Sequence, residues 1–243
     1  MTTGAAPWIL RLLREGAWFR QLPAPLQEEF VRRSSVRTYR RRQAVTRAGR
    51  VVEGLYGVIE GRIQVTRPVG AEGEDLIHVG EPGFWIGEYS LLTGEPAVVG
   101  TVASTQVRLV LLPRREFERL IEREPRWFRP FALLALERYA LLARQLSDTR
   151  LLPPAERLRG RLADLVELRR AERAGSGAVV LRLSQEELAR IVGVSRQTLN
   201  VLLAVLRDEQ LVEVGFRSLR IPDPARLFAV APPPPFARRR ASG

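Results

Sequence analysis

The apolar residues of the stretch 183–206, LSQEELARIVGVSRQTLNVLLAVL, follow a helical period twice. The first stripe recurs at spacings of three and four residues and consists of Leu188, Ile191 and Val192. The second stripe consists of Leu199, Leu202, Leu203 and Leu206. Gly193 separates them, and glycine most easily adopts the positive φ of a tight turn. The pattern therefore predicts two short amphipathic helices joined by a turn.

Polar residues stand where each of these helices would begin. Ser184 is followed three residues later by Glu187, which is the spacing of a capping box. Ser195 can cap the second helix, and Ala189 is small where the two helices would cross closely. Together these features predict a helix-turn-helix, the unit that places its second helix in the DNA major groove. An ordinary helical hairpin with a solvated polar face is the alternative.

The outer face of the second helix carries side chains that can read DNA bases. Arginine can bind guanine O6 and N7 in a fork, and glutamine or asparagine can do the same to adenine N6 and N7. We therefore expect contacts with double-stranded DNA from Ser195, Arg196, Gln197, Thr198, Asn200, Val201 and Arg217. In this prediction Arg196 and Gln197 read bases with help from Asn200.

The segment 211–221, LVEVGFRSLRI, has two short apolar runs on either side of Gly215. This pattern is typical of a β-hairpin, which would form a wing beside the two helices. Arg217 lies near the tip of the wing, where it suits a phosphate contact. We expect Ser195 and Thr198 to hold phosphates as well, and Val201 to make at most an apolar contact.

In the first half of the chain, helix-like segments are followed by a series of strand-like runs. Residues 1–43 look helical, with a break at Pro23 and Pro25, and end in the basic cluster Arg37 to Arg42. This cluster is either a DNA-facing patch or a solvated helix end. From Val45 to Leu112, short β-branched runs alternate with glycines, which favours a sandwich or barrel of antiparallel strands.

A short helix is predicted over Pro113–Glu122, and a long one follows over Pro125–Arg150 without an internal glycine. Apolar residues recur along the long helix near the 3.5-residue spacing of a coiled-coil seam, at Phe128, Phe131, Ala135, Leu142, Leu146 and Thr149. Arg138 and Tyr139 interrupt the seam. The helix either forms a dimer interface or packs on its own domain, and Pro153 and Pro154 end it.

These elements predict an α+β fold with a sandwich or barrel of strands, a long helix and a C-terminal winged helix-turn-helix domain. A further helix over Glu156–Arg173 and a flexible turn over Gly175–Gly177 precede the helix-turn-helix. The expected parts are an N-terminal helical segment (1–24), the β-rich domain (25–124), the long helix (125–152), the DNA-binding domain (153–225) and a disordered tail rich in proline and arginine (226–243).

Charge and composition narrow the possible partners. The chain of 243 residues has a formal net charge of +12, which favours a polyanionic partner. Nucleic acid fits better than a membrane, since no run approaches the ~18 apolar residues of a membrane-spanning helix. The N-terminus lacks the pattern of a signal peptide, so we expect a cytoplasmic protein.

The residue types that support many kinds of catalysis are missing. There is no cysteine and no lysine, which excludes disulfides, zinc–thiolate sites, iron–sulfur clusters and Schiff bases. The one histidine, His78, lies in the strand-like run LIHV, where a plain packed or exposed side chain is expected rather than a haem ligand. A metal-dependent enzyme built on a cupin-like jelly roll would need several histidines. We therefore expect no enzyme, no metal and no cofactor.

The combination of a β-rich domain, a long helix and a winged helix-turn-helix resembles the Crp-Fnr family of bacterial transcription regulators over residues 25–222. Three motifs carry the resemblance: EGRIQV around Gly61, PGFWIGEYSLLTGEP at 82–96 with its pair Gly87 and Glu88, and VSRQT at 194–198. The resemblance implies that 25–124 is a cyclic-nucleotide-binding-type β jelly roll, joined by a dimerisation helix at 125–152 to the DNA-binding domain. It also implies a homodimer that binds a pseudo-palindromic promoter site and contacts RNA polymerase. It also implies that the motif at 82–96 is a phosphate-binding cassette, so that Gly87 and Glu88 are candidates for binding an effector.

The cassette departs from the cyclic-AMP-binding members of the family. Those members hold the cyclic phosphate with an arginine a few residues after the glutamate, whereas this chain has Ala97, Val98, Val99 and Gly100 there. A buried phosphate without a cationic partner is costly. The sequence thus argues against tight cyclic AMP binding, unless Arg108 reaches inward. Glu88 would then be a structural turn residue, and the effector stays unknown; a cyclic-nucleotide-dependent regulator is the alternative.

The recognition helix also departs from the family prototype. Gln197 stands in place of a glutamate, and Val201 in place of an arginine that is often found there. Glutamate accepts a hydrogen bond from cytosine N4, whereas glutamine suits adenine, so we expect a half-site that differs at that base. A non-specific architectural DNA binder is a further alternative, suggested by the net charge alone; its affinity would fall steeply with salt.

Overall fold

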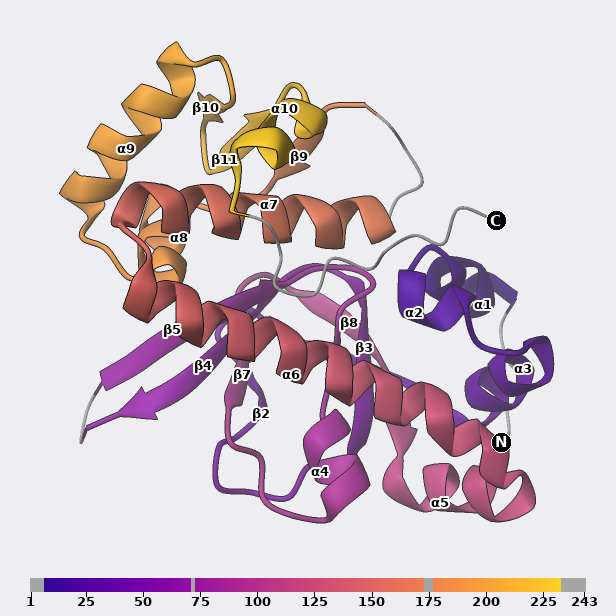
Figure 1. Ribbon diagram of the computed structural model, residues 1–243. Helices are drawn as coiled ribbons and strands as arrows, with labels where there is room; N and C mark the ends of the chain where they lie inside the picture. The colour runs from indigo at the N-terminus through magenta and orange to yellow at the C-terminus, as the bar shows by residue number, and fades with distance from the viewer. Residues whose placement is uncertain (1–6, 71–72, 173–176, 233–243) are drawn as a thin grey trace. The chain divides into compact units, whose positions relative to one another are not determined.

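The structure is a computed structural model that describes residues 7–70, 73–172 and 177–232. The chain divides into two compact units, Met1–Glu137 (unit 1) and Arg138–Gly243 (unit 2). We describe each unit by itself (Figure 1).

Unit 1 begins with three helices, α1 (Pro7–Arg14), α2 (Ala17–Arg20) and α3 (Ala24–Arg33). Pro25 lies in the first turn of α3, where its missing N–H is not needed. The prediction of helix as far as residue 43 is wrong beyond Arg33, because the chain continues as strand β1 (Ser35–Tyr39). Its β-branched and aromatic residues favour a strand, and all five residues pair with strand β8.

The basic cluster Arg37 to Arg42 therefore lies on β1 and on the turn after it, and the reading as a solvated helix end is wrong. Arg42 has a φ of 70° in this turn, and its N–H donates to Ala103 O at 2.7 Å. Arg37 forms an ion pair with Glu53, with 3.5 Å between nitrogen and oxygen. Whether the cluster faces DNA stays a prediction.

The described part of unit 1 contains two four-stranded antiparallel sheets, in the orders β1-β8-β3-β6 and β2-β7-β4-β5. The remaining strands of these sheets are β2 (Ala44–Thr46), β3 (Gly54–Glu60), β4 (Ile63–Val69), β5 (Gly73–Gly80), β6 (Trp85–Ile86), β7 (Gly100–Ala103) and β8 (Val107–Pro113). β8 lies between β1 and β3, and its register places Leu111 opposite both Ser35 and Tyr56. This is the predicted all-antiparallel β-sandwich.

Both faces of β8 are buried, which explains its continuous apolar sequence. Leu109 and Leu111 point into the core between the two sheets, whereas Val110 and Leu112 point into the core under the helices. The second core also holds Trp85, whose ring leaves room only for a glycine on the neighbouring strand. A Cβ on Gly57 would lie 2.5 Å from that ring.

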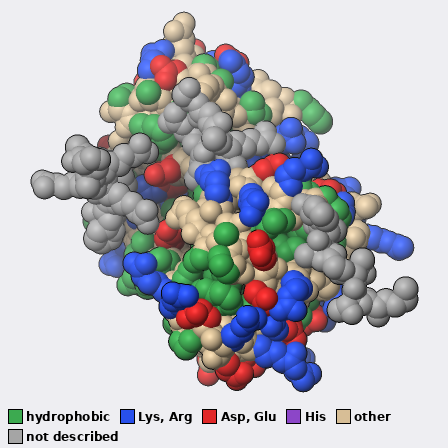
Figure 2. Space-filling model, turned by 90° about the vertical axis from the view of Figure 1, so that its right-hand side faces the viewer, with side chains coloured by type: hydrophobic (Ala, Val, Ile, Leu, Met, Phe, Trp, Pro, Cys, Tyr) green, Lys and Arg blue, Asp and Glu red, His purple; other side chains and the backbone are tan. Residues whose placement is uncertain are grey.

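Unit 1 also contains helix α4 (Glu88–Thr93), between β6 and β7, and helix α5 (Arg114–Arg123), after β8. α5 was predicted from its sequence, and α4 was not. Arg33 of α3 bridges Glu29 at 3.0 Å and Glu116 of α5 at 2.8 Å. Figure 2 shows arginine and carboxylate side chains intermixed on one face of the molecule, so part of the large positive charge is balanced locally.

A 3-10 turn, η1 (Pro125–Trp127), leads into the long helix α6 (Phe128–Leu151), which confirms the predicted helix and runs from unit 1 into unit 2. Unit 2 continues with α7 (Pro154–Glu172), β9 (Val179–Leu181), α8 (Gln185–Val192), α9 (Arg196–Asp208), β10 (Glu213–Gly215), β11 (Ser218–Ile221) and α10 (Pro224–Val230). The three strands form an antiparallel sheet in the order β10-β11-β9. Helices α7 to α10 and this sheet enclose one apolar core.

The C-terminal tail is folded further than the sequence predicted. Residues 226–230 belong to α10, and Leu227 is fully buried in the core of unit 2. Asp223 caps this helix by accepting from the backbone N–H of Ala225 at 2.9 Å. The prediction of disorder is therefore wrong for 226–230. The rest of the predicted tail, 233–243, and residues 175–176 of the predicted turn lie outside the described residues.

No single helix in the described parts of the chain is long and apolar enough to cross a membrane. Helices α8 and α9 reach that length and apolar composition only when they are taken together, and they are bent by 100° relative to each other. Their apolar side chains lie in the core of unit 2.

Candidate nucleic-acid interface

The two helices predicted from the apolar pattern, α8 and α9, are held by the predicted caps. Ser184 Oγ accepts from the N–H of Glu187 at 3.2 Å, and the carboxylate of Glu187 accepts from the N–H of Ser184 at 2.7 Å. Gly193 ends α8 with a φ of 74° and a ψ of 45°, the left-handed conformation that glycine adopts without strain. The chain then turns by 100° into α9, which is within the range of a helix-turn-helix.

The two faces of α9 differ sharply. Leu199, Leu203 and Leu206 are buried in the core of unit 2, as predicted, and Leu202 is half-buried. The predicted DNA-reading residues are on the other face, and all of them are exposed: Arg196, Gln197, Asn200 and Val201. This separation confirms the predicted orientation of the helix. It does not test which bases or phosphates these residues contact.

The first turn of α9 can also hold a phosphate through its backbone. Ser195 Oγ accepts from the N–H of Thr198 at 3.0 Å, and the hydroxyls of these two residues lie 2.8 Å apart. The cap thus satisfies one of the helix's free N–H groups, while those of Arg196 and Gln197 have no partner within the helix. Exposed N–H groups at a helix N-terminus attract anions. The predicted phosphate contacts of Ser195 and Thr198 would add to this backbone site.

The predicted wing is present as the hairpin β10–β11. Gly215 and Ser218 form its last pair, so Phe216 and Arg217 make the two-residue loop at its tip. Arg217 is exposed and has a φ of 49°, which is uncommon for a residue with a side chain. Its predicted phosphate contact stays a prediction.

The sequence analysis missed the residues that hold α9 against the rest of unit 2. Arg159 of α7 donates to both carboxylate oxygens of Glu209, at 2.9 and 3.0 Å, just after the C-terminal end of α9. Arg226 of α10 donates to Glu209 O at 3.1 Å. Arg159 and Glu209 are fifty residues apart in the chain, and no local pattern links them. These contacts position α9 and are not themselves part of its exposed face.

The cassette motif of unit 1 forms a tight turn and a short helix. Gly87 and Gly94, with φ values of 95° and 83°, flank α4. A Cβ on Gly87 would lie 2.3 Å from Gly54 O, so the fold itself requires this glycine. Glu88 begins α4 and is half-buried. This geometry does not test whether Gly87 and Glu88 bind an effector.

The segment that follows the cassette contains no cation. Ala97 and Val99 pack against the core between the sheets, and Val98 is exposed. Arg108 does not supply the missing charge, because it donates to Glu60 Oε1 at 2.8 Å and its guanidinium lies 4.5 Å from the centre of the Trp8 ring.

The cation beside this segment comes from another part of the chain. The backbone of Arg50 accepts from Ala97 N–H at 2.9 Å, and its side chain is exposed. No carboxylate in the described ranges forms an ion pair with it.

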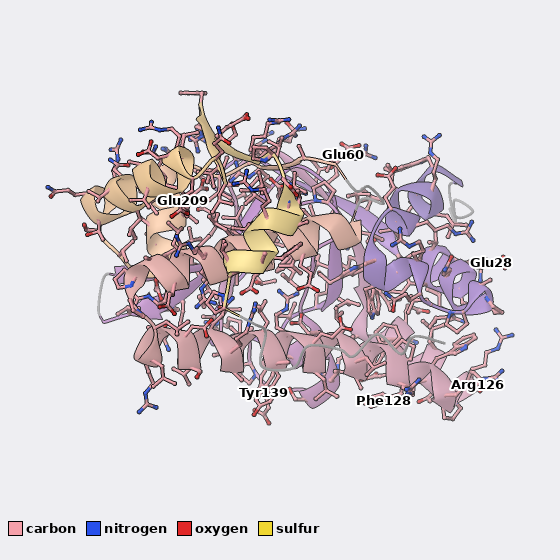
Figure 3. All side chains as sticks on the ribbon, turned by 45° about the horizontal axis from the view of Figure 1, so that its top comes forward. Glu28, Glu60, Arg126, Phe128, Tyr139 and Glu209 are labelled. Carbon is pink, nitrogen blue, oxygen red and sulfur yellow. The ribbon has the colours of Figure 1, made fainter. Side chains whose placement is uncertain are left out.

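The long helix α6 has one buried face and one exposed apolar face. Phe131 and Leu134 are buried in the core of unit 1, so placing Phe131 in the seam was wrong. The exposed apolar residues recur instead at Phe128, Leu136, Tyr139, Leu142 and Leu146. Tyr139 is 70% exposed and belongs to this face rather than interrupting it. Phe128 and Tyr139 project from the same side of α6 (Figure 3).

Within residues 7–70, 73–172 and 177–232, no three side chains of His, Cys, Asp or Glu lie together as a metal site would require. His78 of β5 stacks on Phe84, with 4.7 Å between the ring centres. Of the two expectations for His78, a packed or an exposed side chain, the structure shows the packed one.

Comparisons with known proteins agree with this architecture. Residues 36–124 match the family model of the cyclic nucleotide-binding domain, and residues 156–230 match that of the Crp-like helix-turn-helix domain. The cyclic AMP receptor protein of Thermus thermophilus is 30% identical over 199 residues, which cover 80% of this chain and 87% of that protein. The CRP-like cAMP-activated global transcriptional regulator of Mycobacterium tuberculosis is 26% identical over 173 residues, covering 71% and 77%.

Solved structures give the same result. The c-di-GMP responsive global regulator CLP of Xanthomonas campestris superposes with a TM-score of 0.63 at 25% identity, covering 82% of this chain and 99% of that one. FixK2 of Bradyrhizobium japonicum superposes with a TM-score of 0.71 at 15% identity, covering 82% and 98%. At that identity the second likeness shows the fold alone.

Proposed function

The chain belongs to the Crp-Fnr family of bacterial transcription regulators, and on that premise we propose that it binds a pseudo-palindromic promoter site as a homodimer without requiring cyclic AMP. The observation that carries the proposal is the exposed row of Arg196, Gln197 and Asn200 on α9, opposite a leucine face on which Leu199, Leu203 and Leu206 are buried. Two such helices in a dimer would enter the major groove about one DNA turn, ~34 Å, apart.

Each exposed residue of α9 has a distinct role in this proposal. Arg196 forks to a guanine, and Gln197 pairs with an adenine where a glutamate would select a cytosine. Asn200 assists, and Val201 offers only an apolar contact, for example to a thymine methyl. In the described parts of the chain Arg196 forms no ion pair with a carboxylate, so its guanidinium is available to DNA.

The exposed apolar face of α6 supports the homodimer. Tyr139, Leu142 and Leu146 lie on successive turns of one helix and remain accessible in the single chain. Apolar residues at this spacing pack well against a second copy of the same helix. We therefore keep 125–152 as the proposed dimerisation helix, with the jelly roll of 25–124 before it and the DNA-binding domain after it.

The cassette supports a regulator that does not depend on cyclic AMP. Ala97 and Val99 occupy the segment where a cyclic phosphate would need a cation, and both pack against apolar residues. Effectors also differ among the relatives: the Mycobacterium protein is named as cAMP-activated, and the Xanthomonas protein as c-di-GMP responsive. The alternative, a cyclic-nucleotide-dependent regulator, would need a cation from outside this segment, and the exposed Arg50 of the neighbouring loop is one candidate.

Three further expectations accompany the proposal. By family resemblance, the DNA-bound dimer contacts RNA polymerase. A regulator of this family acts where the chromosome lies, so the cytoplasm remains the expected location. We propose no catalytic activity, no metal and no cofactor.

The test is selection of duplex DNA from a random pool by the purified protein, without added ligand, at about 0.15 M salt. Recovery of a two-fold symmetric site would support a specific dimer that is active without an effector. Recovery of unrelated sequences would favour architectural binding instead. If a symmetric site appeared only after cyclic AMP or cyclic GMP was added, the cyclic-nucleotide-dependent alternative would replace the proposal.

Calorimetry separates the two readings of the cassette. The proposal predicts no micromolar heat with cyclic AMP or cyclic GMP. Heat that is present in the wild type and absent in Arg50→Ala would show that the loop supplies the cation.

A further inference from the structure

The tip of the wing carries a large apolar side chain in water. Phe216 is 93% exposed, the highest value among the large hydrophobic residues in the described ranges. Scattered exposed hydrophobic residues are ordinary on protein surfaces. A two-residue hairpin loop, however, normally takes glycine, asparagine, aspartate or serine. Phe216 therefore makes almost no packing contact with the described residues, and its ring is available to a partner.

The charges around Phe216 are positive and uncompensated. Arg217 follows it in the loop, held at a φ of 49°, and strained conformations of this kind gather at functional sites. Leu181 of β9 pairs with Leu219 of β11, so Arg182 continues β9 toward the tip of the hairpin. Both arginines are exposed, and neither forms an ion pair with a carboxylate of the described residues.

The other end of the hairpin is neutral. Glu213 and Arg220 are paired across the two strands, with 2.7 Å between oxygen and nitrogen. Among the described residues, the arginines of this sheet that form no ion pair with a carboxylate, Arg182 and Arg217, therefore lie toward its tip, where the ring of Phe216 is exposed. An exposed apolar ring beside two guanidinium groups suits a polyanion that also offers stacked aromatic surface, and duplex DNA has both properties.

The position of the wing in the chain places it next to the helix that is proposed to bind the major groove. It follows α9 directly, and Leu211 N–H donates to Leu206 O at 2.9 Å, which ties the start of the hairpin to the last turn of the helix. A surface fixed beside a helix that fills the major groove faces the adjoining phosphate backbone and the minor groove beyond it. Apolar side chains such as phenylalanine enter minor grooves between base steps and partly unstack them.

We propose that Phe216 packs into the minor groove beside the half-site, against a base step, while Arg217 and Arg182 hold the flanking phosphates. This inference rests on the proposed function, because it requires α9 to lie in the major groove. Pyrimidine–purine steps are the easiest to unstack, so the flank should prefer TA or CA. The wing would then read the deformability of a step that α9 does not reach.

The test uses the full chain and duplexes that contain the selected half-site, with 2-aminopurine placed at one flanking position at a time. Wild-type binding should raise the fluorescence at one flanking step, because 2-aminopurine brightens when it unstacks. Phe216→Ala should abolish that rise and weaken binding about 5- to 150-fold, the range implied by aromatic stacking on a base. Phe216→Trp should restore both. Arg217→Ala is the matched control, and should weaken binding while the fluorescence rise remains at saturation.

Two results would overturn the inference. The first is wild-type binding to the symmetric site with no flanking step brightened and with Phe216→Ala as tight as the wild type. The second is unchanged DNA binding by Phe216→Ala together with reduced transcription in a purified system, which would assign Phe216 to a protein contact. Failure of the wild type to select any symmetric site would instead refute the proposed function, and this inference with it.

Discussion

Replacing Asp164 by leucine should strongly destabilise unit 2, because its carboxylate lies between two buried arginines. Asp164 of α7 forms ion pairs with Arg144 of α6 and, at 3.7 Å, with Arg161 of its own helix. The exposed fractions of the three side chains are 4%, 11% and 6%. Burial lowers the pKa of Arg144 and brings that of Arg161 down to about 10, although nearby Asp148 acts in the opposite direction.

The burial determines the expected magnitude. Removing one partner of a buried ion pair leaves an uncompensated charge and costs about 3–5 kcal/mol, whereas an exposed pair contributes about 0–1 kcal/mol. Two arginines share Asp164, so we expect the leucine variant to lose at least about 3 kcal/mol of unfolding free energy. Replacing all three residues together, as Arg144→Met, Arg161→Met and Asp164→Leu, should cost less than the single change, because no buried charge is then left unpaired.

The chain offers a matched control and a way to observe unit 2 separately. Glu213→Ala breaks the exposed pair with Arg220 in the same unit and should cost at most about 1 kcal/mol. All four tryptophans lie in unit 1, so fluorescence in a urea titration follows unit 1, whereas far-ultraviolet circular dichroism follows the helices of both units. Asp164→Leu should lower the urea midpoint of the dichroism transition and leave the midpoint of the fluorescence transition unchanged. The reasoning would be refuted if Asp164→Leu lost less than about 1 kcal/mol of unfolding free energy, or if the triple variant were less stable than Asp164→Leu.

Three other predictions follow from particular contacts. Arg196→Ala should cost ~1–3 kcal/mol of DNA-binding free energy and relax the preference at one base, whereas Arg217→Ala should weaken all sequences alike, as measured by binding titrations over a series of salt concentrations. An unchanged preferred sequence in Arg196→Ala would show that α9 is not the reading helix. Leu146→Glu should convert the dimer to a monomer in sedimentation experiments, and a dimer of unchanged strength would rule out the exposed face of α6 as the interface. The hydrogen bond from Arg33 lowers the pKa of Glu116, so unit 1 should lose stability as the pH falls from about 4.3 through that lowered pKa. Glu116→Gln should make this acid-dependent loss of tryptophan-monitored stability shallower, and an unaltered pH profile would exclude the pair as its source.

The parts of the fold that were predicted correctly depend on contacts close in sequence. The capping box of Ser184 and Glu187 spans three residues, and the turn at Gly193 is a property of one residue. The errors came from distant partners. Residues 35–39 form a strand because they pair with β8, whose residues lie about seventy positions later. Phe131 has the spacing of the seam but is buried, because α2, α3 and α5 bring the rings of Trp18, Phe30 and Phe117 against it.

The candidate site likewise has a part that follows from the local sequence and a part that depends on distant contacts. The exposed face of α9 was predictable from periodicity, since whichever side of the helix is not leucine must face outward. The contact of Arg159 with Glu209 was not, because it depends on how α7 packs in the folded unit. Arg108 is the instructive case. Its position on a strand allowed its side chain to point inward toward the cassette. The structure shows instead that its guanidinium lies over the Trp8 ring and donates to Glu60.

The cassette shows why a motif and its ligand must be argued separately. Gly87 is required by the fold alone, because any side chain there would collide with Gly54 O. Gly94 ends α4 in the left-handed conformation, which likewise needs a glycine whether or not a nucleotide binds. The glycines of the motif therefore carry no information about an effector. An effector that carries a phosphate would need a cation beside the motif, and Ala97, Val98 and Val99 offer it none. A phosphate would have to recruit a cation from outside this segment, such as Arg50, whose backbone accepts from Ala97 N–H, or Arg114, which donates to Ser90 O at 3.4 Å. The calorimetric comparison with Arg50→Ala tests the first of these.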